Sequence, residues 1–237
     1  MILVFHLCIS LVHYRRVLIG LIATSKRKPG TVAAAVIEEK RTALSRKIAR
    51  WRLLQAVYMP VVAADLLGVN VSSETPELQD LQLPSALAVA MRAQLLTEHD
   101  LLRKEFRLRI AQADDALDAL RRVLALRNAV YGYKQVNLVG QRDGTRAHTL
   151  LSRLNDKRVA CASRYRAVRS ALVALNFDGP WKDRLKPLLE SDIKGPTGDD
   201  DDGTALPNRS VLGEGTRTLS WIWKVSTGDV PSAGNVF

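Results

Sequence analysis

The fold is decided first by EHDLLRKEFRLRIAQADDALDALRRVLALRNAVYGYKQVNLVG, residues 98–140. Its apolar residues recur at alternating steps of three and four positions, which is the spacing of the buried stripe of an amphipathic helix and of a coiled-coil seam. These seam residues are Phe106, Ile110, Ala113, Leu117, Leu120, Leu124 and Tyr131. The stretch therefore predicts one long helix.

A second stretch, TRAHTLLSRLNDKRVACASRYRAVRSALVALN at residues 145–176, repeats this spacing. Arg158 interrupts it where an apolar residue is expected, and the seam otherwise comprises Leu151, Leu154, Cys161, Tyr165, Val168, Leu172 and Leu175. Between the stretches, Gly140-Gln141-Arg142-Asp143-Gly144 predicts a short polar turn. Long helices joined by so short a turn lie antiparallel. We therefore expect an all-α fold with a long antiparallel, coiled-coil-like helical hairpin at 98–176.

Composition agrees with this fold class and indicates the kind of partner. Of the 237 residues only 5% are aromatic, and abundant Ala, Leu and Arg favour long helices over a thick sheet-bearing core. The net charge is +11, which favours polyanionic partners: nucleic acid first, and an acidic membrane surface second. Cys8 and Cys161 are far apart and have no CxxC partner, so neither a disulfide framework nor a zinc site is expected.

The N-terminal region predicts additional helices. Residues 1–23 are apolar but are interrupted by His13-Tyr14-Arg15-Arg16, so neither apolar run is long enough to span a bilayer. A buried helix and a membrane-associated or secretory segment both remain open for them. Residues 31–59 predict a further helix, which Pro60 ends or kinks. Its Trp51 is either a core anchor or part of a basic, aromatic surface.

Changes in composition suggest how the chain is divided. An apolar and basic segment covers 1–30, and a helical domain that includes the hairpin covers 31–190. Residues 191–212, with four consecutive aspartates at 199–202, predict a disordered acidic linker. A tail at 213–237 carries Ser220-Trp221-Ile222-Trp223, and because exposed tryptophans are costly we expect this segment to dock on the helices or on a partner. Further upstream, Leu83-Pro84-Ser85 predicts the start of a short helix through Leu95, with Ser85 as its cap.

No combination of residues in the sequence predicts catalysis. Nucleophile-elbow, phosphate-loop, HExxH and dinucleotide-binding patterns are missing from the sequence. Asp114, Asp115 and Asp118 form the one tight acidic cluster of the hairpin, but Arg121 and Arg122 follow within a turn, so helical ion pairs account for them better than a metal site does. We expect no catalytic site, no metal site and no cofactor.

The basic residues of the hairpin are the stronger signal. Sixteen basic residues against eight acidic ones give residues 98–176 a net charge of +8. Such a surface can neutralise phosphates without reading bases, so non-specific DNA contacts are expected. The predicted contact residues are Arg142, Arg146, Arg153, Lys157, Arg164 and Arg166. The alternative is that these charges are the solvated outer face of a coiled coil.

Several segments also resemble the region C-terminal to the catalytic core of Kyakuja-Dileera-Zisupton (KDZ) transposases of fungal genomes. They follow the same order over about 43–225: RWRLLQAVYMP (50–60), LPSAL (83–87), EFRLRIAQADDALDALRRVLALRNAVYGYK (105–134), GQRDGTRAHTLLSRL (140–154), ASRYRAVRSALVAL (162–175) and EGTRTLSWIW (214–223). The resemblance implies a piece or solo relative of a DNA transposon protein. The family's RNase-H-like acidic core and its cysteine cluster have no counterpart in the sequence, so no catalytic residue is carried over.

These observations lead to one leading hypothesis and two alternatives. The leading hypothesis is a non-catalytic, transposase-derived nuclear protein whose hairpin serves as an accessory nucleic-acid-binding or assembly module. The first alternative is a structural coiled-coil protein that pairs with a second copy through the helical seam. The second is a decayed transposon fragment without function. A membrane is not an expected partner, although membrane association through residues 1–23 is the alternative localisation.

Overall fold

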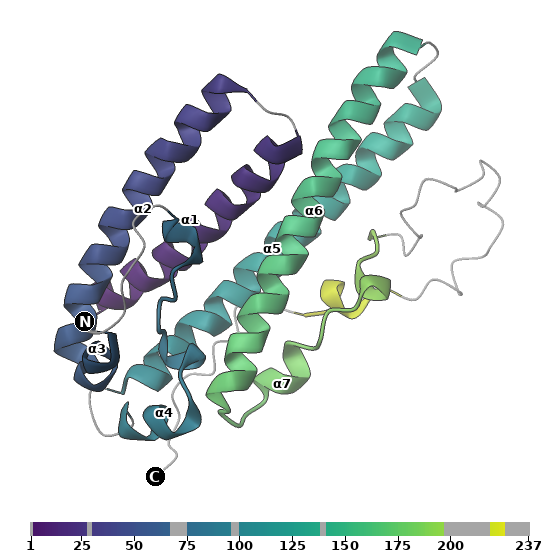
Figure 1. Ribbon diagram of the computed structural model, residues 1–237. Coiled ribbons are helices and arrows are strands. Elements are labelled where there is room, and N and C mark those ends of the chain that lie inside the picture. Colours follow the sequence, from purple (N-terminus) through teal and green to yellow (C-terminus); the bar gives the residue numbers. More distant parts are fainter. Residues whose placement is uncertain are drawn as a thin grey trace. The chain divides into compact units, whose positions relative to one another are not determined.

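The computed structural model describes residues 2–27, 30–66, 75–95, 100–137, 141–196 and 219–225. Within these ranges every regular element is an α-helix or a short 3-10 helix, and there is no strand (Figure 1). The predicted all-α fold class is therefore confirmed. The predicted linker at 191–212 lies largely outside the described residues.

The chain forms two compact units, Met1–Leu108 and Arg109–Phe237. The boundary falls inside one continuous helix, α5 (Leu101–Asn137), rather than in a loop. The segments predicted from composition, 1–30, 31–190, 191–212 and 213–237, stay a prediction. They are defined by changes in residue type, whereas the two compact units are defined by contacts between residues.

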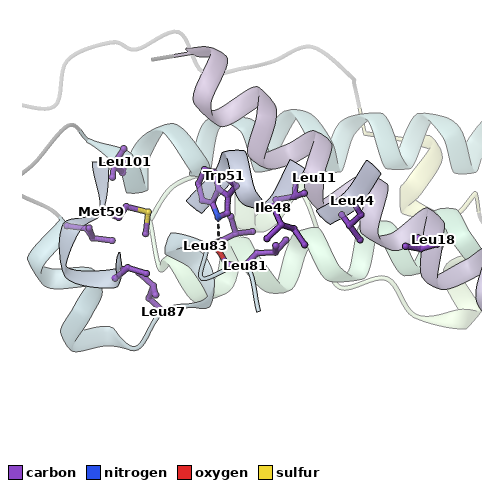
Figure 2. Close-up of a cluster of buried hydrophobic side chains, with 12 residues drawn as sticks. Leu11, Leu18, Leu44, Ile48, Trp51, Met59, Leu81, Leu83, Leu87 and Leu101 are labelled. Carbon is purple, nitrogen blue, oxygen red and sulfur yellow. Dashed lines mark hydrogen bonds between the residues drawn. The ribbon is translucent and has the colours of Figure 1, made fainter. Parts of the chain in front are cut away.

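In the first unit α1 (Ile2–Arg27) packs on α2 (Thr31–Tyr58), and α2 packs on α3 (Pro60–Leu66). The boundaries of α2 follow from local chemistry: Gly30 has an extended backbone before its first turn, and Pro60 begins the next helix. The core between the first two helices is formed by Leu11 and Leu18 against Leu44 and Ile48 (Figure 2). Residues 10–23 thus belong to a helix with a buried side, the first of the two interpretations left open by the sequence.

Trp51 is the polar anchor of this core. Its side chain is buried, and its Nε1 donates a hydrogen bond of 2.8 Å to the carbonyl oxygen of Leu81 (Figure 2). Gln55, one turn later on α2, donates from Nε2 to the same carbonyl at 3.0 Å. Both bonds attach the extended segment around residue 81 to α2. Trp51 is therefore a core residue and not part of a basic, aromatic surface.

Glu77 connects three elements of the first unit through a partly buried ion pair and a hydrogen bond to its carbonyl oxygen. The Glu77 carboxylate, in the 3-10 helix Pro76–Leu78, accepts hydrogen bonds from Arg41 of α2, with Nη2 to Oε1 at 2.7 Å. Arg15 of α1 donates from Nε to the Glu77 carbonyl oxygen at 2.6 Å. Burial alone would raise the pKa of Glu77, but the hydrogen bonds from Arg41 and from the Glu77 backbone outweigh it and hold this pKa below its usual value of 4.5.

The predicted helix over 83–95 is wrong in two respects. A 3-10 turn at Pro84–Ala86 comes first, and α4 (Val89–Leu95) begins separately after it. Ser85 caps neither element, because its N and Oγ both donate to the Glu105 carboxylate, at 2.8 and 2.6 Å. A buried carboxylate twenty residues away competes successfully for the hydroxyl that the sequence pattern assigned to a local cap.

The second unit is built on the rest of α5 and on α6 (Gln141–Leu175). Their inward residues are buried at the predicted spacing: Ile110, Ala113, Leu117, Leu120 and Leu124 on α5, and Leu151, Leu154, Tyr165, Val168, Leu172 and Leu175 on α6. The two ribbons lie alongside each other in this unit (Figure 1).

Electrostatic effects between the two helices fit an antiparallel register. The charge of Arg122 acts on Cys161, and that of Asp114 acts on Tyr165. In each pair, one residue precedes position 140 and the other follows it by nearly the same number of residues. The detailed coiled-coil hairpin stays a prediction, and these facts fit it.

The predicted turn at Gly140–Gly144 is wrong over its last four residues. Helix α6 already begins at Gln141, so Arg142, Asp143 and Gly144 belong to its first turn, and residues 138–140 lie outside the described part. Glycine is costly in a helix interior, but in the first turn its amide needs no partner within the helix. A glycine pair therefore does not fix where a turn ends.

A C-terminal strap, defined as residues 181–196 and 219–225, packs on this helix pair. It contains α7 (Trp181–Arg184) and the 3-10 helix Trp221–Trp223, and its apolar side chains Trp181, Leu185, Leu188, Ile193 and Ile222 are buried. Arg121 of α5 donates to the carbonyl oxygens of Ile222 and Val225, both at 2.6 Å. The prediction that the tryptophan-rich tail docks on the helices is thus confirmed for residues 219–225.

Candidate nucleic-acid interface

Four of the six predicted contact residues lie on one face of α6. At 100° per residue, Arg146, Arg153, Lys157 and Arg164 fall within about 40° of one another around the helix. The first three are exposed and Arg164 is half-buried. From Arg146 to Arg164 this α6 basic stripe is about 27 Å long at 1.5 Å per residue. It is a single row of cations that can follow a phosphate backbone.

Arg166 does not belong to this stripe. It lies about 160° away around the helix, donates from Nε to the Leu188 carbonyl at 3.0 Å, and pairs with Glu190 at 3.0 Å. The structure therefore uses Arg166 to hold the C-terminal strap. The side chain of Arg142 lies outside the described residues, although its backbone belongs to α6.

Arg158, the residue that interrupts the predicted seam, is also engaged by the strap. Its Nη1 donates to Glu190 at 2.7 Å, and its Nε donates to Asn155 at 3.0 Å. Hydrogen bonds from Arg166 and Arg158 hold the pKa of Glu190 below its usual value. One carboxylate therefore joins two arginines of α6, and this explains why the apolar spacing is broken at Arg158.

Arg122 of α5 adds a further cation beside the stripe, and sequence reasoning missed it as a contact residue. Burial raises the pKa of the Cys161 thiol, while the charges of Arg164, Arg122 and Lys157 oppose that rise. Three cations from two helices are thus close enough to Cys161 to act on it. The Arg122 Nε also donates to the Asp118 carbonyl at 3.3 Å. The signal that could have found Arg122 is an antiparallel register counted from the turn, which places it across from Cys161.

The acidic cluster on α5 is used for ion pairs. Asp114 accepts two hydrogen bonds from Arg184 of α7, at 2.7 and 3.1 Å. Asp118 accepts one from Arg121 at 2.6 Å, the short-range pair expected from the sequence. The pair with Arg184 was not predicted, because it joins residues seventy positions apart. Among the described residues no three or more His, Cys, Asp or Glu side chains form a group suited to a metal ion.

Comparison of the chain with protein-family models, with curated proteins and with solved structures finds no match. The resemblance to KDZ transposases accordingly stays a prediction from the quoted segments. In the described part of the chain, no helix combines the length and the apolar character needed to cross a bilayer.

Proposed function

We propose that the protein is a non-catalytic, transposase-derived module that binds nucleic acid through phosphate contacts. The contact surface consists of the α6 basic stripe together with Arg122. The observation that supports it best is that Arg146, Arg153, Lys157 and Arg164 lie on one face of α6. Among the described residues, neither Arg153 nor Lys157 nor Arg164 has an ion-pair partner within 4.0 Å. Their charges are therefore available to an external anion.

This surface suits binding without sequence preference. Arginine and lysine on a straight helix face reach phosphate oxygens, but the charges alone carry no information about base edges. Each neutralised phosphate releases counterions, so the logarithm of the binding constant falls with the logarithm of salt concentration by about 0.9 per contact on duplex DNA. Five contacts give a slope of about −4.5. We expect micromolar or weaker binding at physiological salt, similar for unrelated duplexes.

Fluorescence anisotropy with a random duplex at several salt concentrations tests the proposal. A triple variant, Arg153→Gln, Lys157→Gln and Arg164→Gln, should bind at least about tenfold more weakly at low salt and lose about 2.7 from the slope. The matched control, Arg103→Gln, Arg107→Gln and Lys186→Gln, removes the same net charge from exposed residues that are not part of the stripe. Flat titrations of the unaltered protein at low salt, or equal losses in both triple variants, would contradict the proposal.

The non-catalytic part of the proposal has its own test. Purified protein is incubated with supercoiled DNA and magnesium, and the expected outcome is that no nicked circles accumulate. Nicking that persists through purification would show that the chain is an enzyme. The transposon origin is tested by the adjoining genomic sequence, where we expect a reading frame that encodes an acidic catalytic core.

The alternative of a structural protein that pairs through the helical seam is less well supported. The seam residues Leu117, Leu120, Tyr165 and Leu172 are buried within a single chain. A second copy could use this seam only after the two helices separated, and separation would expose the whole core of the second unit.

A further inference from the structure

The outer face of α2 carries an uncovered apolar pattern. Val32, Leu53 and Val57 are 77%, 72% and 68% exposed, and Val36 is also exposed. At 100° per residue they lie about 80–180° around the helix from Leu44, outside its buried side. Isolated exposed apolar residues are common, but a periodic set along one helix face is typical of an interface.

These residues belong to a continuous heptad pattern. Starting at position 32, the face repeats at alternating steps of four and three positions, the spacing of a coiled-coil seam. Its members, here called the α2 outer face, are Val32, Val36, Glu39, Ala43, Arg46, Arg50, Leu53 and Val57. All are exposed except Ala43, which is half-buried.

The α2 outer face is symmetric about its midpoint between positions 44 and 45. Residues at equal distances from this midpoint are complementary in kind: apolar with apolar at both ends, acid with base further in, and a small residue with a long one at the centre. The four pairs are Val32 with Val57, Val36 with Leu53, Glu39 with Arg50, and Ala43 with Arg46. In an antiparallel pair of identical helices, residues at equal distances from the midpoint lie opposite each other.

We propose that the protein forms an antiparallel homodimer through the α2 outer face. Val32 and Val36 of one copy pack on Val57 and Leu53 of the other, and Glu39 pairs with Arg50 of the second copy. The twofold axis makes every contact occur twice. This inference does not depend on the proposed function, and it uses a surface of the first unit that is distinct from the helical seam.

Charge complementarity favours a second copy over an unrelated partner. Among the described residues, Glu39 and Arg50 have no ion-pair partner in their own chain, and each gains one in the antiparallel pair. An unrelated partner would need charges that complement this face. Only a second copy of the same chain needs the face to complement itself, as it does. Beside the face, small residues recur every seven positions and allow two helices to approach closely. These exposed residues are Ala35, Thr42, Ala49 and Ala56.

Light scattering and sedimentation of the full chain at about 0.15 M salt, where charges beyond about 8 Å are largely screened, test the proposal. The unaltered protein should change from monomer to dimer within about 1 µM to 1 mM, the range of modest interfaces. Glu39→Arg and Arg50→Glu, each made alone, replace two attractive contacts with two repulsive ones and should weaken the dimer at least about tenfold. Arg107→Glu makes the same charge change as Arg50→Glu at an exposed position on α5 and should leave the dimer unchanged.

Two rescue experiments separate pairing from loss of folding. The double variant Glu39→Arg with Arg50→Glu restores opposite charges in the homodimer, and an equimolar mixture of the two single variants restores them in a heterodimer. Both should dimerise like the unaltered protein. A monomer at every concentration, or a dimer that the single reversals leave intact, would overturn the proposal. Failure of both rescues while circular dichroism shows folded helices would overturn it as well.

Discussion

Two neighbouring acids on α5 show how strongly position determines the role of a charged residue. Asp114 is buried and forms a bidentate pair with Arg184, whereas the next residue, Asp115, is exposed. Sequence reasoning grouped the two because they are adjacent. The fold separates them by about 100° around the helix, so one connects α5 to α7 and the other faces solvent.

Replacing Asp114 should therefore destabilise the protein. Asp114→Asn leaves the Arg184 guanidinium partly buried without its counter-charge, and we expect a loss of about 2 kcal/mol in the free energy of unfolding. This is below the value for a fully buried pair, because both side chains keep some exposure to solvent. Urea denaturation measures the change. Asp115→Asn is the matched control and should change the free energy of unfolding by less than about 0.5 kcal/mol.

The Glu77 carboxylate should make stability depend on pH. Its pKa in the folded protein is held below 4.5, so its pairing with Arg41 stabilises the fold fully above that pH and is lost as the pH falls through the folded value. The difference in the free energy of unfolding between the unaltered protein and Glu77→Gln should be constant from neutral pH to about pH 5 and shrink below it. Denaturation at a series of pH values measures it. A difference that stays constant down to strongly acidic pH would contradict this role of Glu77.

At this scale the candidate site is only partly predictable. A helical projection places Arg153, Lys157 and Arg164 on one face, and it would also have excluded Arg166. The projection cannot explain why an arginine occupies seam position 158. Its partner Glu190 is thirty-two residues later, in a segment without regular periodicity. Roles that depend on such distant partners require the tertiary structure.

Among the elements, the C-terminal strap is the one whose removal should affect the second unit most. Ile222 is 0% exposed, and the residues around it are attached to the rest of the strap, with Ser220 Oγ donating to the Asp192 carbonyl at 2.7 Å and Trp223 Nε1 to the Lys194 carbonyl at 3.0 Å. Ile222→Ala should lower the free energy of unfolding by about 2–4 kcal/mol, the usual range for deleting a buried aliphatic side chain. Thermal or urea denaturation measures this. Leu189→Ala is the control, because Leu189 belongs to the same strap but is 61% exposed; equal losses in the two variants would contradict the docked arrangement.

The long helices could be predicted from sequence, and the short elements could not. Apolar repeats, such as Leu117 with Leu124 on α5 and Leu151 with Leu172 on α6, specify the two long helices, since a periodicity over about seven turns exceeds any local ambiguity. Pro60 likewise fixes the end of α2. The 3-10 turns at 76–78 and 84–86 are held by Arg41 and Glu105, which are distant in sequence. Local patterns therefore could not specify them.

For the molecule as a whole, the two compact units predict two regions that open independently. Ile222→Ala weakens contacts of the second unit only, so hydrogen exchange should accelerate within 109–137 and 141–196 while residues 31–58 keep their protection. Exchange followed by mass spectrometry resolves these segments. A uniform acceleration along the whole chain would show instead that the two units unfold as one cooperative body.

The hydrogen bonds from Arg121 to Ile222 and Val225 join residues 101 and 104 positions apart. Closing so large a loop costs chain entropy before any contact is gained, whereas each turn of α5 and α6 forms between near neighbours. Refolding of the second unit should therefore be sequential, with helix formation early and arrival of Trp221 and Trp223 last. Until that final step the Ile222 side chain, which is buried in the folded protein, stays in water, and this late intermediate is the species most prone to aggregate.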